Sequence, residues 1–115
     1  MSKPIVLKDP MFELLRLGKI KQFNEKRDTE VEYNLRGTDL SRIDLRGLNA
    51  DNLNFSDAYF RQTDLRGIDF RKANLEGASF AAANISGCYF PPELSFEEIS
   101  FSLEHGTRVR YRKAA

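Results

Sequence analysis

An apolar side chain recurs at every fifth position through the middle of the chain, between residues 35 and 90. An α-helix turns about 100° per residue, so a period of five would carry these side chains around the helix. A flat strand alternates its faces, so an odd period would place them on opposite faces. The spacing therefore excludes both a long regular helix and a long regular strand. The twelve positions hold Leu35, Leu40, Leu45, Ala50, Phe55, Phe60, Leu65, Phe70, Leu75, Phe80, Ile85 and Phe90.

A chain that runs extended for three residues and then bends keeps all of these side chains in one core. Gly recurs two positions after the central residue, where a bend needs a residue that accepts positive φ at low cost. Asp or Asn precedes the central residue nine times, and these side chains hydrogen-bond nearby backbone amides at bends. The pattern predicts a β-solenoid with a bend every five residues, whose coils stack at the spacing of paired strands.

The repeated segments "ANLEG", "ANISG", "TDLRG" and "IDLRG" resemble the pentapeptide-repeat family. The resemblance implies four pentads per coil, and hence an all-β fold: a right-handed quadrilateral β-helix of about three coils. The count of four pentads per coil comes from the resemblance, because the spacing of the residues requires only a bend at every fifth position. We assign residues 33–92 to this β-helix, within a single domain that spans residues 1–115.

Helical caps are expected at both ends, because a solenoid otherwise exposes its edges and its core. Residues 1–32 form the predicted N-terminal cap, with Asp9 as a helix N-cap and Gly18 as a stop. Residues 93–115 are predicted to form a C-terminal helix and a basic strand or tail. Ser95 and Glu98 have the spacing of a capping box, and apolar residues follow at helical spacing: Phe96, Ile99 and Leu103.

Composition argues against several classes of function. The net charge is +1, so no overall field favours nucleic acid or an acidic membrane as a partner. Cys88 and His105 are the single residues of their kinds, and no catalytic, cofactor-binding or metal-ligating pattern is present in the sequence. We therefore expect a protein without enzymatic activity or cofactor. The lone cysteine and the lack of a long apolar segment predict a cytoplasmic protein without a membrane span.

Two basic groups are candidate interaction residues. Arg46 and Arg66 should stack on one face of the coils, beside Asp44 and Asp64. This strip has two interpretations, a mixed-charge ion-pair patch or a recognition surface. The second group lies in the alternating segment "TRVRYRK", which suits a half-exposed strand, a solvated tail or an interface, and it comprises Arg108, Arg110, Arg112 and Tyr111.

The best-supported function at this stage is a protein-interaction or scaffold module with an unidentified protein partner. An exposed edge at the C-terminal strand would also allow a homo-oligomer. The resemblance supplies an alternative, because some pentapeptide-repeat proteins protect DNA gyrase by imitating duplex DNA. Such a DNA-mimicking modulator needs an acidic face, whereas residues 33–92 contain seven acidic and seven basic side chains.

Overall fold

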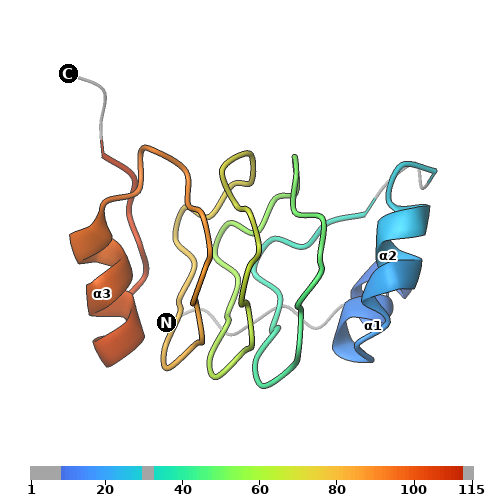
Figure 1. The fold of residues 1–115 in the computed structure, drawn as a ribbon, viewed down its shortest axis with the longest axis horizontal. Coiled ribbons are helices and arrows are strands. Elements are labelled where there is room, and N and C mark those ends of the chain that lie inside the picture. The colour runs from blue at the N-terminus through green and yellow to red at the C-terminus, as the bar shows by residue number, and fades with distance from the viewer. Residues whose placement is uncertain (1–8, 30–32, 113–115) are drawn as a thin grey trace.

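The computed structural model describes residues 9–29 and 33–112. It contains three helices in the described residues: α1 (Pro10–Arg16), α2 (Ile20–Lys26) and α3 (Phe96–His105). Between α2 and α3 the chain winds in successive coils, with α1 and α2 at one end and α3 at the other (Figure 1). Parts of the predicted caps, residues 1–8, 30–32 and 113–115, lie outside the described residues.

The predicted bends are confirmed, since a two-residue turn recurs every five residues from Arg36–Gly37 to Ser86–Gly87. Parallel bridges join residues twenty positions apart, so four pentads complete each coil. The all-β assignment is confirmed only in part. The straight segment between two bends is so short that only isolated bridges form, and no continuous strand is present in the described ranges. The parallel bridges are Asp39–Tyr59, Asp44–Asp64, Asn54–Asn74, Tyr59–Ser79, Asp64–Asn84 and Asp69–Tyr89.

The Asp and Asn side chains fix the bends as predicted. In all nine repeats that have one of these residues before the central position, its Oδ1 accepts a hydrogen bond from the backbone N–H two residues later, at 2.9–3.2 Å. Each side chain thus replaces a backbone acceptor at its corner. The nine residues are Asn34, Asp39, Asp44, Asn49, Asn54, Asp64, Asp69, Asn74 and Asn84.

Five bends place a residue other than glycine at positive φ, between 55° and 63°. At five other bends glycine takes this conformation, which costs other residues about 1–2 kcal/mol, and only at the bend of Lys72 does the equivalent residue avoid positive φ. The pentad geometry is therefore strong enough to impose the same bend where glycine is missing. The five residues are Arg42, Asn52, Asp57, Gln62 and Ala82.

The central side chains form one core along the axis of the coils. Ten of the twelve are at most 2% exposed, and the two exceptions are Ile85 and Phe90 in the third coil. Residues one coil apart stack, as the twenty-residue period requires. The rings of Phe60 and Phe80 lie 5.1 Å apart at an interplanar angle of 9°, and those of Phe70 and Phe90 lie 5.9 Å apart at 20°.

Helices α1 and α2 close the first coil with apolar side chains. Asp9 caps α1 as predicted, because its Oδ1 accepts from the N–H of Met11 at 2.7 Å. Phe12, Leu15 and Phe23 are buried against the core.

Polar side chains of the same helices satisfy the backbone of the first coil. Arg16 donates from Nη1 to the carbonyl of Ser41 at 2.8 Å, and Asn24 donates to the carbonyl of Gly47 at 2.9 Å. Arg27, which is only 9% exposed, donates from its two Nη atoms to the carbonyls of Asn49 and Asp51. At the carbonyls of Ser41 and Asn49 these donors occupy the places that backbone amides of a preceding coil would take.

Helix α3 confirms one half of the predicted capping box. The Oγ of Ser95 accepts from the N–H of Glu98 at 3.2 Å. The Glu98 carboxylate does not return to Ser95, because its Oε1 accepts instead from the N–H of Arg110 at 2.8 Å. The apolar face is also rotated from the one that helical spacing suggested: Ile99 is buried as expected, whereas Phe96 is 76% exposed.

Candidate functional surfaces

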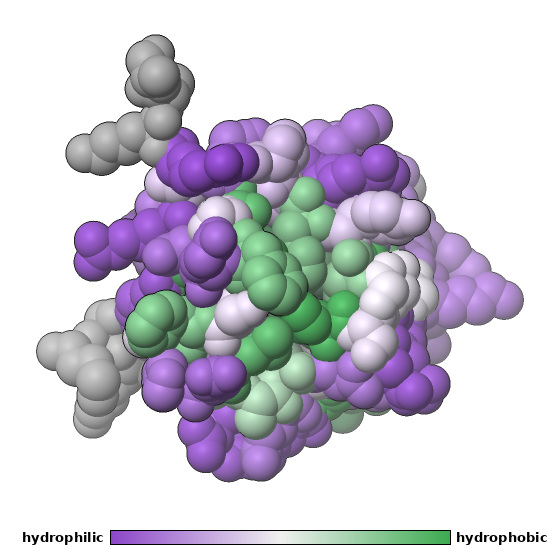
Figure 2. All heavy atoms as spheres, turned by 60° about the vertical axis from the view of Figure 1, so that its left-hand side comes forward, coloured by the Kyte–Doolittle hydropathy of each residue, from purple (hydrophilic) through white to green (hydrophobic). Residues whose placement is uncertain are grey.

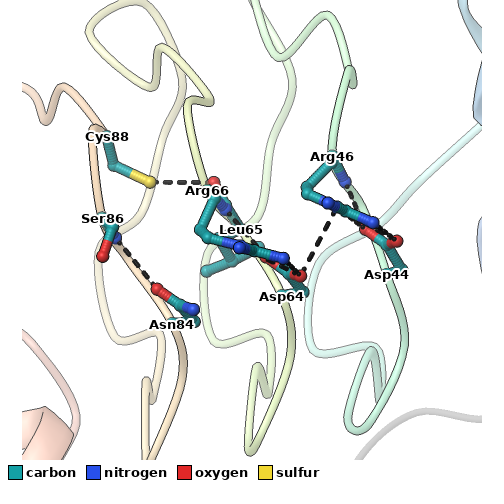
Figure 3. A network of polar contacts seen from close by, with 8 residues as sticks. All are labelled: Asp44, Arg46, Asp64, Leu65, Arg66, Asn84, Ser86 and Cys88. Atoms are coloured by element: carbon teal, nitrogen blue, oxygen red, sulfur yellow. Dashed lines mark hydrogen bonds and ion pairs between the residues drawn. The ribbon is translucent and has the colours of Figure 1, made fainter.

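A ladder of ion pairs joins the first two coils on one face (Figure 3). Arg46 binds Asp44 of its own pentad through Nε and Nη2, at 3.0 and 2.8 Å. Arg66 binds Asp64 in the same way, at 2.9 and 2.7 Å. Arg46 also lies 3.4 Å from the Asp64 carboxylate, which links the two coils. The ladder does not continue into the third coil, where Asn84 takes the place of the aspartate.

Asp64 has the most strongly bound carboxylate of the ladder. Hydrogen bonds from the Arg66 side chain, together with the Arg66 backbone N–H and the charges of Arg66 and Arg46, lower the pKa of Asp64 to about 2. The side chain of Asp64 is 25% exposed to solvent, so the pairing takes place at the protein surface. Surface pairs of this kind contribute little to stability unless several form a network.

The ladder bears on both interpretations of the Arg46–Arg66 strip, a mixed-charge ion-pair patch and a recognition surface. The guanidinium forks of both arginines are bound to aspartates within their own coils, so the face alternates in charge. That arrangement is a mixed-charge patch. It differs from the continuous acidic face that imitation of duplex DNA requires.

The segment that contains the predicted basic tail is paired with the last coil. Arg108 forms an antiparallel bridge with Ser79, and the N–H of Val109 donates to the carbonyl of Ala78 at 2.8 Å. Arg108 donates to the carbonyl of Gly77 at 2.9 Å, and its guanidinium lies over the ring of Tyr59, 5.0 Å from the centroid. Around Val109 the segment is therefore paired with the last coil, through an isolated bridge and not a continuous strand.

Other candidate residues of this segment also bind the coils. The hydroxyl of Tyr111 accepts from the N–H of Leu75 at 2.8 Å, and burial raises the pKa of Tyr111. Arg112 donates from Nη2 to the carbonyl of Pro92 at 2.9 Å. Arg110 is exposed, and its side chain has no ion pair among the residues that the structure describes. Arg110 can therefore bind an external carboxylate.

Figure 2 shows apolar side chains gathered on the end of the molecule that carries α3. On α3 itself, Phe101 is 58% exposed and lies beside two shallow hollows. The larger hollow, about 550 Å³, is lined by Glu98, Phe101, Thr107, Arg108 and Arg110. The smaller, about 240 Å³, lies on the other side of Phe101 and includes His105, whose ring is 5.2 Å from that of Phe101. We name the larger hollow together with Phe101 the α3 groove.

The α3 groove was not predicted from the sequence. Phe101 does not belong to the helical spacing of Phe96, Ile99 and Leu103 from which the helix was predicted. A large apolar residue outside that spacing is the signal that could have revealed the groove. Arg110 was predicted as an interaction residue, and the fold brings it to the same hollow as Phe101.

Cys88, the one cysteine of the sequence, is held in a structural contact. The thiol of Cys88 donates to the carbonyl of Leu65 at 2.9 Å, and burial raises the pKa of Cys88. Within residues 9–29 and 33–112, no three His, Cys, Asp or Glu side chains are grouped as metal ligands. The helices in these ranges are also too short or too polar to cross a membrane.

Comparison with protein families identifies the type of repeat that forms the coils. The model described as pentapeptide repeats matches residues 34–67 and 54–90, with eight copies of the repeat. The chain belongs to the pentapeptide-repeat family, as the repeated segments suggested. No curated protein and no solved structure gives a significant match to the chain.

Proposed function

We propose that this protein is a non-catalytic scaffold that binds a protein partner in the α3 groove. The observation that carries the proposal is the position of Phe101, a large apolar side chain left 58% exposed beside a hollow of about 550 Å³. Aromatic residues and arginine are enriched at protein interfaces, and the groove combines Phe101 with Arg110.

The chemistry of the groove favours an extended segment with an apolar side chain next to a carboxylate. Phe101 supplies an apolar surface for the first group. Arg110 supplies a planar guanidinium for the second, and it can hold a carboxylate through two hydrogen bonds. The rigid coils would keep the groove in a constant orientation relative to the other faces.

Membership of the family supports the architecture that we propose for the coils. Pentapeptide repeats usually form a β-helix, and we infer a right-handed quadrilateral one for residues 33–92. The inward side chains fill the core of the coils, which favours binding at the surface over catalysis. We also propose that the protein acts in the cytoplasm, where its lone cysteine would remain reduced.

The proposal is tested by affinity capture from a lysate of the cells that produce the protein. Three baits are compared: the whole chain, a Phe101→Ser, Arg110→Ser variant, and a Leu17→Ser control. Leu17 is a second exposed apolar residue, 64% exposed, at the end of α1. A partner captured by the whole chain and by the control, but lost with the double variant, would support the groove. Equal capture by all three baits, or no specific capture by any, would contradict it.

A further inference from the structure

The described parts of the caps leave half of the third coil without full cover. In its first two pentads the inward residues are buried: Leu75, Ala78 and Phe80 are 0% exposed and Ala73 is 7% exposed. In its last two pentads the inward residues are only partly buried, although their counterparts one coil earlier are at most 2% exposed. We name residues 83–90 the open edge. Its inward residues are Ala83, Ile85, Cys88 and Phe90.

The backbone of the open edge has unpaired donors. One coil earlier, Leu65 and Phe70 donate their N–H groups to carbonyls of the third coil, at 2.9 and 2.7 Å. The corresponding N–H groups of Ile85 and Phe90, and that of Gly87 between them, have no acceptor among the residues that the structure describes. Unpaired backbone groups beside apolar side chains are the usual template for association along an edge.

Charge is absent from this part of the chain. Residues 77–92 contain no charged side chain, although charged residues make up 30% of the whole protein. The outward positions one coil earlier carry two ion pairs, Asp64–Arg66 and Asp69–Arg71. The equivalent positions of the open edge hold neutral residues, namely Asn84, Ser86, Tyr89 and Pro91.

We propose that two copies of the chain associate through their open edges. In a two-fold interface the residues close to the axis meet their own copies, so a charge there would meet a like charge, and an edge without charge avoids this repulsion. Two-fold pairing of edges is antiparallel. The same coil already accepts an antiparallel segment, because Ser79 bridges Arg108 on the neighbouring face.

The other end of the coils favours a closed dimer over a filament. There α1 and α2 cover the first coil, and Arg16, Asn24 and Arg27 bind its carbonyls. Because one end is covered and the other is open, pairing of like ends completes the assembly. This self-association uses a different edge from the C-terminal strand that the sequence suggested, since that strand is paired within its own chain around Val109.

The dimer is tested by sedimentation velocity on the full-length chain over a range of concentrations. Ser86→Arg introduces, at an exposed corner, the residue that Arg46 and Arg66 already provide at the equivalent corners of the earlier coils, so it is compatible with the fold. Ser56→Arg is the control, because it makes the same change at a corner of the second coil. Thermal unfolding of each variant verifies that it is folded.

We expect the whole chain and Ser56→Arg to form dimers, and Ser86→Arg to remain monomeric. Hydrogen exchange at Ile85 and Phe90 should slow as the concentration of the whole chain rises, with no such change in Ser86→Arg. A whole chain that is monomeric at its highest soluble concentration would overturn the proposal. A dimer that persists in Ser86→Arg, with exchange at Ile85 and Phe90 unaffected, would place the interface elsewhere and overturn it equally.

Discussion

The hydroxyl of Ser102 in α3 accepts a hydrogen bond from the backbone N–H of Phe80 at 2.7 Å, and both residues are fully buried. The same hydroxyl donates to the carbonyl of Thr107 at 2.6 Å. The Ser102 side chain therefore supplies the acceptor that a fourth coil would offer to the Phe80 N–H. It also fixes the turn after α3. This contact explains why a small polar residue occupies the buried face of the helix.

Replacement of Ser102 by alanine should destabilise the protein. It leaves the Phe80 N–H and the Thr107 carbonyl without their partner in a buried site, which costs about 1–3 kcal/mol. Urea unfolding measures the change. Ser100→Ala, at a partly exposed position of the same helix, should alter stability by less than about 0.5 kcal/mol. Equal stability of the two variants would contradict the role assigned to Ser102.

Replacement of Arg27 by methionine should destabilise the opposite end. Methionine retains the apolar stem but loses both donors to the carbonyls of Asn49 and Asp51, at an expected cost of about 1–3 kcal/mol. Lys21→Met, on the exposed side of α2, provides the control. If the two variants unfold at the same urea concentration, water satisfies those carbonyls as well as Arg27 does.

Alanine should be tolerated less well at Gly77 than at Gly47. Both glycines have positive φ, 79° and 86°, so each substitution incurs backbone strain of about 1–2 kcal/mol. Only at Gly77 would the new Cβ also meet a neighbour, lying 2.1 Å from Oδ1 of Asp57. That carboxylate is paired with Arg36 at 3.2 Å, so its displacement adds to the cost. Thermal unfolding of both variants should give the lower midpoint for Gly77→Ala, and the reverse order would refute the clash.

Acid should weaken the protein partly through Asp64. The pKa of Asp64 in the folded state is lowered, from 3.8 to about 2, chiefly by hydrogen bonds from the Arg66 side chain. A lowered pKa means that the folded state favours the ionised carboxylate. Its contribution is therefore present above pH 3.8 and is lost as the pH falls towards 2.

Asp64→Asn should flatten the dependence of stability on pH within that window, as measured by urea unfolding between pH 5 and about 2. Arg66→Gln should flatten it as well, because it removes the cause of the shift. An unchanged slope in both variants would show that the ion pair is not maintained in solution.

The sequence predicted the period, the corners and the order of the elements, because these depend on short-range contacts within each pentad. Asp39 and Asn84, for example, each accept from the amide two residues later, so their position in the repeat suffices to predict this hydrogen bond. The capping helices were likewise visible in local signals such as Asp9 and Ser95.

The candidate surfaces were less predictable, because they depend on how the caps meet the coils. Helical spacing alone placed Phe96 with Ile99, whereas the buried face of α3 is set by Ser102 and its bond to Phe80. Similarly, the arginines of the C-terminal segment have different surroundings only because that segment pairs with the last coil. Arg108 then lies over Tyr59 and Arg110 faces the groove.

The twenty-residue coil also determines how such a protein can change in length. An insertion of one complete coil would lengthen the rod and return the chain to the same corner, so α3 would keep its direction relative to α1 and α2. An insertion of a single pentad would lengthen it by a quarter of a coil and turn the α3 groove onto the next face. Duplication of the repeat can therefore adjust either the separation or the relative direction of the two ends, without any change in the residues that bind.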